Sequence, residues 1–202
     1  TMLVYQMLKE AGEKVMVGGN LEISLLELLP QIDKNTWLVA ELSSWQQEGL
    51  EICQKSPHIA VITNIVPDHL NRYQNMKKYV EAKKFILKYQ GKNDYKVLNK
   101  NNSYTPELAL ASSGKNFFFE KKGLNPQIRQ ANSLLGEHNL ENLAAMETVG
   151  KILGIKTQTM VKAVRHFSSP PHRLEKVREI KGVTFYNDSA ATNHGDAIAA
   201  LG

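Results

Sequence analysis

Two short apolar runs, each followed by a polar loop, constrain the fold of this chain most strongly. Residues 36–42 (TWLVAEL) and 58–64 (HIAVITN) are near-continuous in apolar side chains. Strands of a parallel sheet show this pattern because helices cover both of their faces. Residues 76–89 follow the second run and place apolar side chains at helical spacing. Strands that alternate with helices in this way predict a doubly wound, mostly parallel α/β sheet.

Most other segments continue this alternation. We expect strands at 14–17 and 95–99 and helices at 2–11, 21–29, 46–54, 137–153 and 156–167. Residues 115–129 interrupt the alternation and are expected to add antiparallel strands at an edge of the sheet. A stiff segment at 168–171 (SSPP) precedes a predicted hairpin, with strands at 174–180 and 183–187. We therefore predict a first domain at 1–169 and the start of a second at 170–202.

The composition excludes several classes of protein. With 42% apolar and 22% charged residues, the 202-residue chain is not disordered, collagen-like or a coiled coil. The single cysteine, Cys53, cannot form an intramolecular disulfide and fits a reducing compartment. No apolar run approaches the roughly 18–20 residues that a membrane helix needs. We therefore expect a cytoplasmic protein without a membrane span.

Positive charge is concentrated between residues 72 and 100. Nine lysines and arginines against two acids give this stretch a surplus of +7, compared with +5 for the whole chain. Such a run fits a solvated helix face, a site for anionic small molecules or a nucleic-acid surface. Its aromatic residues do not form the glycine-rich motifs of RNA-binding sheets. We therefore expect no nucleic-acid partner.

Polar residues follow the predicted strands at the sheet edge where α/β proteins bind their ligands. They are GGN at 18–20, ELSS at 41–44 and the loop that ends in Asp68 and His69. Glu41 ends an apolar strand, as the Mg²⁺-binding carboxylates of many NTPases do. The alternative for Glu41 is a carboxylate that caps the next helix, and the alternative for His69 is a loop histidine without a ligand.

Lys83 occupies an unusual position on the predicted helix at 76–89. At 100° per residue it falls in the middle of the apolar stripe, which is formed by Met76, Tyr79, Val80, Ile86 and Leu87. Burial disfavours an ammonium group and lowers the pKa of a lysine, which makes the neutral, nucleophilic amine more accessible. The alternative is a lysine that extends its amino group to water.

Two further groups of polar residues fit nucleotide binding. Asn139 and Asn142 lie three residues apart at the start of the helix at 137–153, where their amides match an adenine edge or simply cap the helix. Arg173 follows the stiff segment at 168–171, the joint between the two predicted domains, and fits a contact to a nucleotide phosphate. Asp188 ends the last predicted strand, where it fits a hydrogen bond to a ribose.

The motifs occur in a fixed order. They are GGN at 18–20, ELSSWQ at 41–46, TNIVPDHLNRY at 63–73, EAKKFI at 81–86, GEHNLENLAA at 136–145, PHRLE at 171–175 and NDSAATN at 187–193. In this order the chain resembles the Mur ligase family over essentially its whole length. The resemblance implies three domains: one for a UDP-sugar, a central P-loop NTPase-like domain for ATP and a Rossmann-like domain for an amino acid.

This chain would then be most of the central domain and the beginning of the third. The phosphate-binding loop of the family, GxxGK[ST], would lie just before Thr1. We expect a longer polypeptide upstream, since nothing before the helix at 2–11 resembles an N-cap. These residues alone are expected to lack turnover, because a P-loop normally holds the phosphates.

The GGN and NDSxATN elements are most similar to those of the family member that adds D-glutamate. The resemblance then implies a monomeric, ATP-dependent ligase of bacterial peptidoglycan synthesis. It would join D-glutamate to UDP-N-acetylmuramoyl-L-alanine through an acyl phosphate, with Mg²⁺ neutralising the anions that approach one another. The alternatives are another Mur or folylpolyglutamate-type ligase and a non-catalytic nucleotide-binding module.

The resemblance also implies a role for each matched residue. Glu41 would bind a first Mg²⁺ and His69 a second, and Lys83 would be carbamylated, with its carbamate as an oxygen ligand near the second ion. The remaining positions are Asn139 and Asn142 for adenine, Arg173 and Asp188 for the nucleotide across the joint, Asn20, Ser43 and Gln46 for UDP-N-acetylmuramoyl-L-alanine, and Thr192 for D-glutamate.

One position departs from the family. The family motif reads NDSKATN, whereas this chain has Ala190 in place of the lysine. The lysine would face the phosphates, so Ala190 removes one positive charge from the region of phosphoryl transfer. We expect lowered activity unless Arg173 or another basic residue compensates.

Overall fold

The computed structural model describes residues 1–21 and 23–191. Its strands are β1 (Val15–Gly19), β2 (Trp37–Glu41), β3 (Ile59–Ile62), β4 (Tyr95–Asn99), β5 (Lys115–Phe119), β6 (Glu175–Ile180) and β7 (Val183–Asn187). Its α-helices are α1 (Met2–Glu10), α2 (Leu25–Leu28), α3 (Ser44–Cys53), α4 (Leu70–Tyr73), α5 (Met76–Lys88), α6 (Thr105–Ala109), α7 (Pro126–Ala131), α8 (His138–Ile152) and α9 (Thr157–Arg165). Short 3₁₀ turns lie at Leu29–Gln31 and Lys121–Gly123.

The first five strands are parallel, which confirms the predicted fold class. β1 pairs with β2, and β3, β4 and β5 form a second hydrogen-bonded set in that order. The predicted antiparallel strands at 115–129 are wrong. α6 carries the chain back along the sheet after β4, so Lys115 pairs with Tyr95 in parallel register. The rest of that segment forms the 3₁₀ turn at Lys121–Gly123 and the start of α7, where Asn125 caps a helix whose first residue is Pro126.

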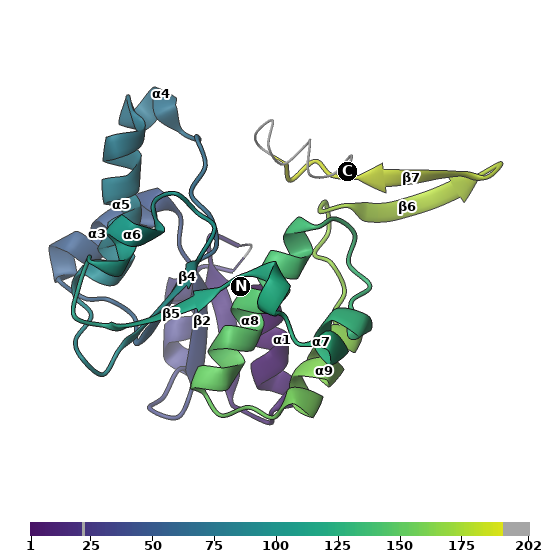
Figure 1. Cartoon of the computed structure of the whole chain (residues 1–202), viewed down its shortest axis with the longest axis horizontal. Helices are drawn as coiled ribbons and strands as arrows, with labels where there is room; N and C mark the ends of the chain where they lie inside the picture. The colour runs from purple at the N-terminus through teal and green to yellow at the C-terminus, as the bar shows by residue number, and fades with distance from the viewer. Residues whose placement is uncertain (22, 192–202) are drawn as a thin grey trace.

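Helices cover the β3–β4–β5 sheet on both sides, with α3, α5 and α6 on one side and α1, α8 and α9 on the other (Figure 1). Ala60 and Ile62 of β3 pack in an apolar cluster with α5. Ile59 and Val61 face a second cluster, formed mainly by α1, α8 and α9. The alternation of side chains along a strand thus buries both faces of β3, as its apolar sequence predicts.

β2 differs from β3. Leu38 on one of its faces is 39% exposed, although its sequence is as apolar as that of β3. The expectation that helices cover both faces of this strand is therefore wrong for the part of the chain that the structure describes. α1 and α2 pack against the neighbouring strand β1.

β6 and β7 form the predicted hairpin, which extends from the α/β body (Figure 1). Lys181 and Gly182 both have positive φ, 49° and 79°, which suits a two-residue turn between twisted strands. The division into domains at 169/170 stays a prediction. Within residues 1–21 and 23–191, no helix is both long enough and apolar enough to cross a membrane.

Candidate active site

The carboxyl ends of β1 and β2 meet closely at GGN and Glu41. Gly19 pairs with Glu41, and the amide of Asn20 donates a hydrogen bond of 2.7 Å to the Glu41 carbonyl oxygen. Gly19 has φ 112°, and a Cβ there would lie 2.1 Å from the same oxygen. Only glycine permits this approach. The GGN motif therefore fixes the position of Glu41, while the Asn20 side chain is exposed beside it.

Glu41 does not cap the next helix. Ser43 is the N-cap of α3, and its hydroxyl accepts a hydrogen bond from the amide of Gln46. Gln46 in turn accepts one of 2.8 Å from the amide of Ser43, which completes a capping box. The capping alternative for Glu41 is therefore wrong, and the half-buried carboxylate stays available to a ligand. Ser43 and Gln46, predicted to face a substrate, have a structural role in this capping box.

The loop after β3 holds His69 in a left-handed conformation, with φ 51°, at the start of α4. The Asp68 carboxylate accepts a hydrogen bond of 2.8 Å from the His69 amide and lies 3.6 Å from its Nε2. Asn102, after β4, supports this loop by donating to Asn64 and to the carbonyl oxygen of Ile65. The His69 ring is 43% exposed, so it can reach a ligand.

His69 belongs to an aromatic cluster with Trp45 of α3, Tyr73 of α4 and Tyr79 of α5. The centroid of the His69 ring lies 5.7 Å from that of Trp45 and 6.2 Å from that of Tyr79. Tyr79 also lies 5.4 Å from Tyr73. These separations are typical of stabilising aromatic pairs. Burial raises the pKa of Tyr79 to about 12, so its hydroxyl is protonated at neutral pH.

Lys83 lies one helical turn after Tyr79, and its Nζ is 5.5 Å from the centroid of the Tyr79 ring. Burial lowers the pKa of Lys83, while the nearby carboxylates of Asp68 and Glu41 oppose this shift. The side chain is half-buried within the predicted apolar stripe. This position does not favour a lysine that extends its amino group into open water. It also places Lys83 in electrostatic reach of the Glu41 and Asp68 carboxylates.

The donors present fit Mg²⁺ held together with phosphate groups. Within the described ranges, no three His, Cys, Asp or Glu side chains gather closely enough to hold a metal ion by themselves. Mg²⁺ usually keeps several waters and takes one or two protein carboxylates together with substrate phosphates. The Glu41 carboxylate at the strand end meets that requirement. The partly exposed His69 ring offers a nitrogen donor on the loop after β3.

The predicted adenine residues lie inside α8 and do not cap it. The N-cap is Glu137. Asn139 donates a hydrogen bond of 2.6 Å to the carbonyl oxygen of Leu135 and accepts one of 3.1 Å from Asn142. The capping alternative is therefore wrong. The two amides form one ordered pair at the sheet edge where α8 begins.

Residues 172–174, which follow the stiff segment at 168–171, contact the end of β7. Asp188 accepts a hydrogen bond of 3.0 Å from the amide of Leu174, and Asn187 lies 2.8 Å from the Nδ1 of His172. Arg173, next to His172, is exposed. Thr192 lies outside the described residues.

The sequence did not identify two residues that support the site through tertiary contacts, Tyr79 and Asn102. Tyr79 was expected to belong only to the apolar core, although its ring contacts both His69 and Lys83. Its spacing of four residues before Lys83 was a usable signal. Nothing in the sequence indicated that Asn102 would support the His69 loop, since the two are brought together by neighbouring strands.

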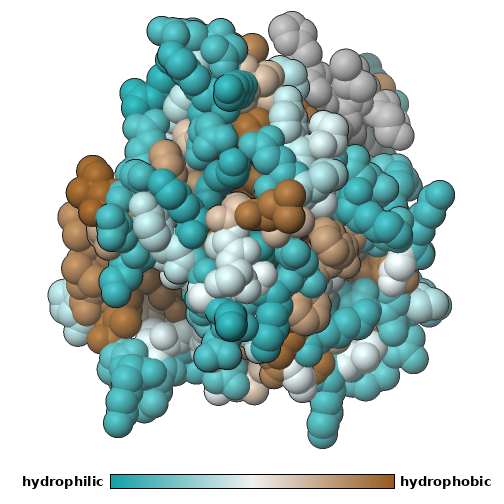
Figure 2. Space-filling model, turned by 60° about the vertical axis from the view of Figure 1, so that its left-hand side comes forward, coloured by the Kyte–Doolittle hydropathy of each residue, from teal (hydrophilic) through white to brown (hydrophobic). Residues whose placement is uncertain are grey.

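Four of the nine basic residues in the stretch at 72–100 form ion pairs with acids of other segments. Arg72 pairs with Glu48 of α3, and Lys88 pairs with Glu51 of the same helix. The face that turns forward in Figure 2 is mostly hydrophilic, with separate hydrophobic patches. These ion pairs favour the interpretation of the stretch as a solvated helix face.

Comparison with known proteins decides the family. Residues 1–134 match the family described as the Mur ligase middle domain. The chain belongs to the Mur ligase family. The match covers β1 to β5 and therefore includes Glu41, His69 and Lys83.

Curated relatives extend the similarity over the whole chain. A UDP-N-acetylmuramoylalanine--D-glutamate ligase from Acetivibrio thermocellus is 37% identical over 222 residues, and one from Koribacter versatilis is 35% identical. These alignments cover 100% of this chain but 47% and 49% of the two relatives. The chain therefore spans about half the length of the curated relatives it matches.

Solved structures show the same fold at low sequence identity. MurF from Acinetobacter baumannii superposes with a TM-score of 0.79 at 18% identity, covering 98% of this chain and 49% of that one. MurF ligase from Thermotoga maritima, solved in complex with ADP, gives a TM-score of 0.78 at 18% identity, covering 99% and 52%. Mur ligases thus share the arrangement of helices and strands described above.

Proposed function

We propose that this chain supplies the ATP- and Mg²⁺-binding part of a ligase that adds D-glutamate to UDP-N-acetylmuramoyl-L-alanine in peptidoglycan synthesis. The observation that carries the proposal is the similarity, at 33–37% identity over the whole chain, to relatives named as D-glutamate ligases. The position of Glu41, His69 and Lys83 about one end of the sheet supports it. In the reaction, ATP phosphorylates the substrate carboxylate, and the amine of D-glutamate displaces phosphate to form the amide.

Glu41 and His69 would hold the two Mg²⁺ ions, which supply neutralising charge where anionic groups must approach one another. Glu41 suits this role because the close pairing of β1 and β2 fixes its backbone and its carboxylate does not cap α3. His69 suits it because its ring is held between Trp45 and Tyr79 while remaining partly exposed.

Lys83 would act as a carbamate. Its neutral amine adds to carbon dioxide, forming a nitrogen–carbon bond and releasing one proton. The product is an anionic oxygen donor instead of an ammonium. The burial that lowers the Lys83 pKa favours the neutral amine that this addition needs.

The remaining residues would bind the organic parts of the substrates. Asn139 and Asn142 would present their paired amides to adenine, and Arg173 and Asp188 would contact the nucleotide from the joint. Asn20, Ser43 and Gln46 lie beside Glu41 and would face UDP-N-acetylmuramoyl-L-alanine. In that case, Ser43 and Gln46 bind through groups that their capping box leaves free. Thr192 would face D-glutamate.

Ala190 favours a second candidate, a nucleotide-binding module without ligase activity. Its amide donates a hydrogen bond of 3.0 Å to the carbonyl oxygen of His172, beside the exposed Arg173. Ala190 thus lies near the segment that carries Arg173 and contributes no charge there. Arg173 would have to provide the positive charge that the family lysine supplies.

A chimeric ligase separates these candidates. In it, this chain replaces the matching half of the Acetivibrio thermocellus relative, and ADP release is measured with UDP-N-acetylmuramoyl-L-alanine and a panel of amino acids. We expect release that requires D-glutamate, and loss of this release in Glu41→Gln but not in Glu51→Gln, a control on α3. Release with a different amino acid would indicate another ligase. Nucleotide binding without release for any acceptor would support the binding module.

A further inference from the structure

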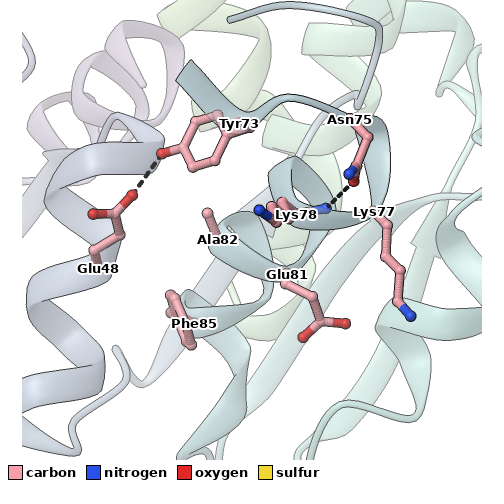
Figure 3. Close-up of a pocket in the computed structure, with 8 residues that line it drawn as sticks. All are labelled: Glu48, Tyr73, Asn75, Lys77, Lys78, Glu81, Ala82 and Phe85. Atoms are coloured by element: carbon pink, nitrogen blue, oxygen red, sulfur yellow. Dashed lines mark hydrogen bonds between the residues drawn. The ribbon is translucent and has the colours of Figure 1, made fainter. Parts of the chain in front are cut away.

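Two carboxylates of α3, Glu48 and Glu51, make the same kind of contact, but at opposite ends of α5. Glu48 accepts hydrogen bonds of 3.0 Å from the Nη2 of Arg72 and 2.8 Å from the hydroxyl of Tyr73. Glu51, three residues later, accepts hydrogen bonds of 2.7 Å from the Nζ of Lys88 and 2.8 Å from the hydroxyl of Tyr89. Each carboxylate thus joins α3 to a basic residue and to the tyrosine that follows it. Figure 3 shows the bond from Tyr73 to Glu48.

The Glu48 contacts continue to His69. The guanidinium of Arg72 lies 5.2 Å from the centroid of the Trp45 ring and 5.7 Å from that of Tyr73. The Trp45 ring in turn lies 5.7 Å from the ring of His69. Glu48 holds Arg72 against Trp45, and Trp45 forms one side of the space in which the His69 ring lies. The contacts of Glu51 lead to the other end of α5.

The local structure around His69 needs such support. α4 has four residues, which is too short for a helix to be stable by itself. A hollow of about 430 Å³ lies next to Glu48 and Tyr73, so neighbouring side chains do not pack fully around this pair (Figure 3). Among the described residues, no side-chain hydrogen bond holds the His69 ring, and the Asp68 carboxylate lies 3.6 Å from its Nε2, beyond hydrogen-bond distance. The orientation of the ring therefore depends on its aromatic neighbours.

We propose that Glu48 is a positioning residue for His69. By holding the Arg72 guanidinium on the Trp45 ring, Glu48 fixes the imidazole between Trp45 and Tyr79. The catalytic meaning of this orientation rests on the proposed function, in which His69 binds Mg²⁺. The orientation itself is a property of this chain and can be measured without nucleotide or metal.

NMR of the His69 ring protons in the 202-residue chain tests the proposal. The His69 signals are assigned by their loss in His69→Gln, and they carry the ring-current shift of Trp45. In Glu48→Gln we expect these signals to move towards the values of a free histidine. Glu51→Gln, the matched control, is expected to leave them unchanged. Arg72→Lys keeps the charge but loses the planar guanidinium and is expected to resemble Glu48→Gln.

The outcomes separate a positioning role from a merely structural one. Equal shifts in Glu48→Gln and Glu51→Gln, or no shift in Glu48→Gln and Arg72→Lys, would overturn the proposal. In the chimeric ligase, Glu48→Gln is expected to lower kcat about 10-fold, the scale found for groups that orient metal ligands, and Glu51→Gln is expected to leave it unchanged. If the wild-type chimera has no activity, the proposed function fails, while the NMR result still decides the orientation of His69.

Discussion

Lys83 is half-buried and Lys96 is fully buried, and the two amino groups have different surroundings. Lys96, on β4, has no exposed surface, and its Nζ donates hydrogen bonds of 2.6 and 2.9 Å to the carbonyl oxygens of Ala109 and Ser112. Burial lowers its pKa, as it does for Lys83. Lys83 has the Tyr79 ring at 5.5 Å and two carboxylates nearby.

The difference shows that burial alone does not mark a reactive lysine. Lys96 ties α6 and the following loop to the sheet, so its amino group is committed to backbone carbonyls. Lys83 lies over the Tyr79 ring, and among the described residues its amino group donates no hydrogen bond. A lowered pKa gains chemical meaning only where the amine is otherwise unoccupied.

The largest effect is expected on turnover. In the chimeric ligase, Lys83→Ala should lower the rate of ADP release at least about 100-fold, because one oxygen ligand of a catalytic metal contributes several kcal/mol and each 1.4 kcal/mol is a factor of 10. Lys96→Met should retain turnover at temperatures where the protein stays folded.

Added short carboxylic acids sharpen this test. They are expected to restore part of the activity of Lys83→Ala, because they replace the missing oxygen donor. A Lys83→Ala enzyme that is not rescued, together with a wild type that is fully active without carbon dioxide, would count against the carbamate.

The comparison also predicts which lysine reacts with carbon dioxide. With ¹³C-labelled bicarbonate, a carbamate signal should appear in the ¹³C NMR spectrum of the chain and should persist in Lys96→Met. It should disappear in Lys83→Arg, and it should grow as pH rises, because only the neutral amine reacts. A signal that survives in Lys83→Arg would show that the carbamate forms elsewhere.

The free energy of unfolding should be lowered more by substitution of Lys96 than by substitution of Lys83, the reverse of the order expected for turnover. Lys96→Met leaves the carbonyl oxygen of Ser112 without this donor, and a buried polar group without a partner costs about 1–3 kcal/mol. The loss is limited because Asn116 also donates to Ala109. Lys83→Met should change the free energy of unfolding by less than about 1 kcal/mol, the scale of a cation–π contact. Urea denaturation of both variants measures the difference, and equal losses would contradict it.

The sequence predicted the strands well where their apolar pattern was decisive. β4 was predicted with its observed bounds at 95–99, and β3 is covered on both faces. The antiparallel strands at 115–129 were wrong, since strand direction depends on where α6 returns the chain and not on local pattern.

Sequence and structure contributed different parts of the candidate site. Lys83 stood out because a charge interrupted an apolar stripe at helical spacing. Lys96 did not, because alternation along a strand gives no sign that α6 covers that position. Tyr79 was assigned to the core, and its contacts with His69 depend on how α4 and α5 pack together.

The smallest effect is a pH dependence of stability. A lysine whose pKa is lowered by folding binds fewer protons in the native state than in the unfolded chain, so the free energy of unfolding rises with pH between the lowered value and the ordinary value near 10.5. Lys96 is expected to contribute to this rise. The loss of stability caused by Lys96→Met should therefore be larger at pH 10 than at pH 7, because the wild type is relieved of a buried charge as Lys96 becomes neutral.

Denaturation curves at the two pH values test this, with Lys92→Met as a control on a nearby exposed lysine. A loss that is the same at both values would mean that Lys96 stays charged, with its two carbonyl partners offsetting the burial of the ammonium.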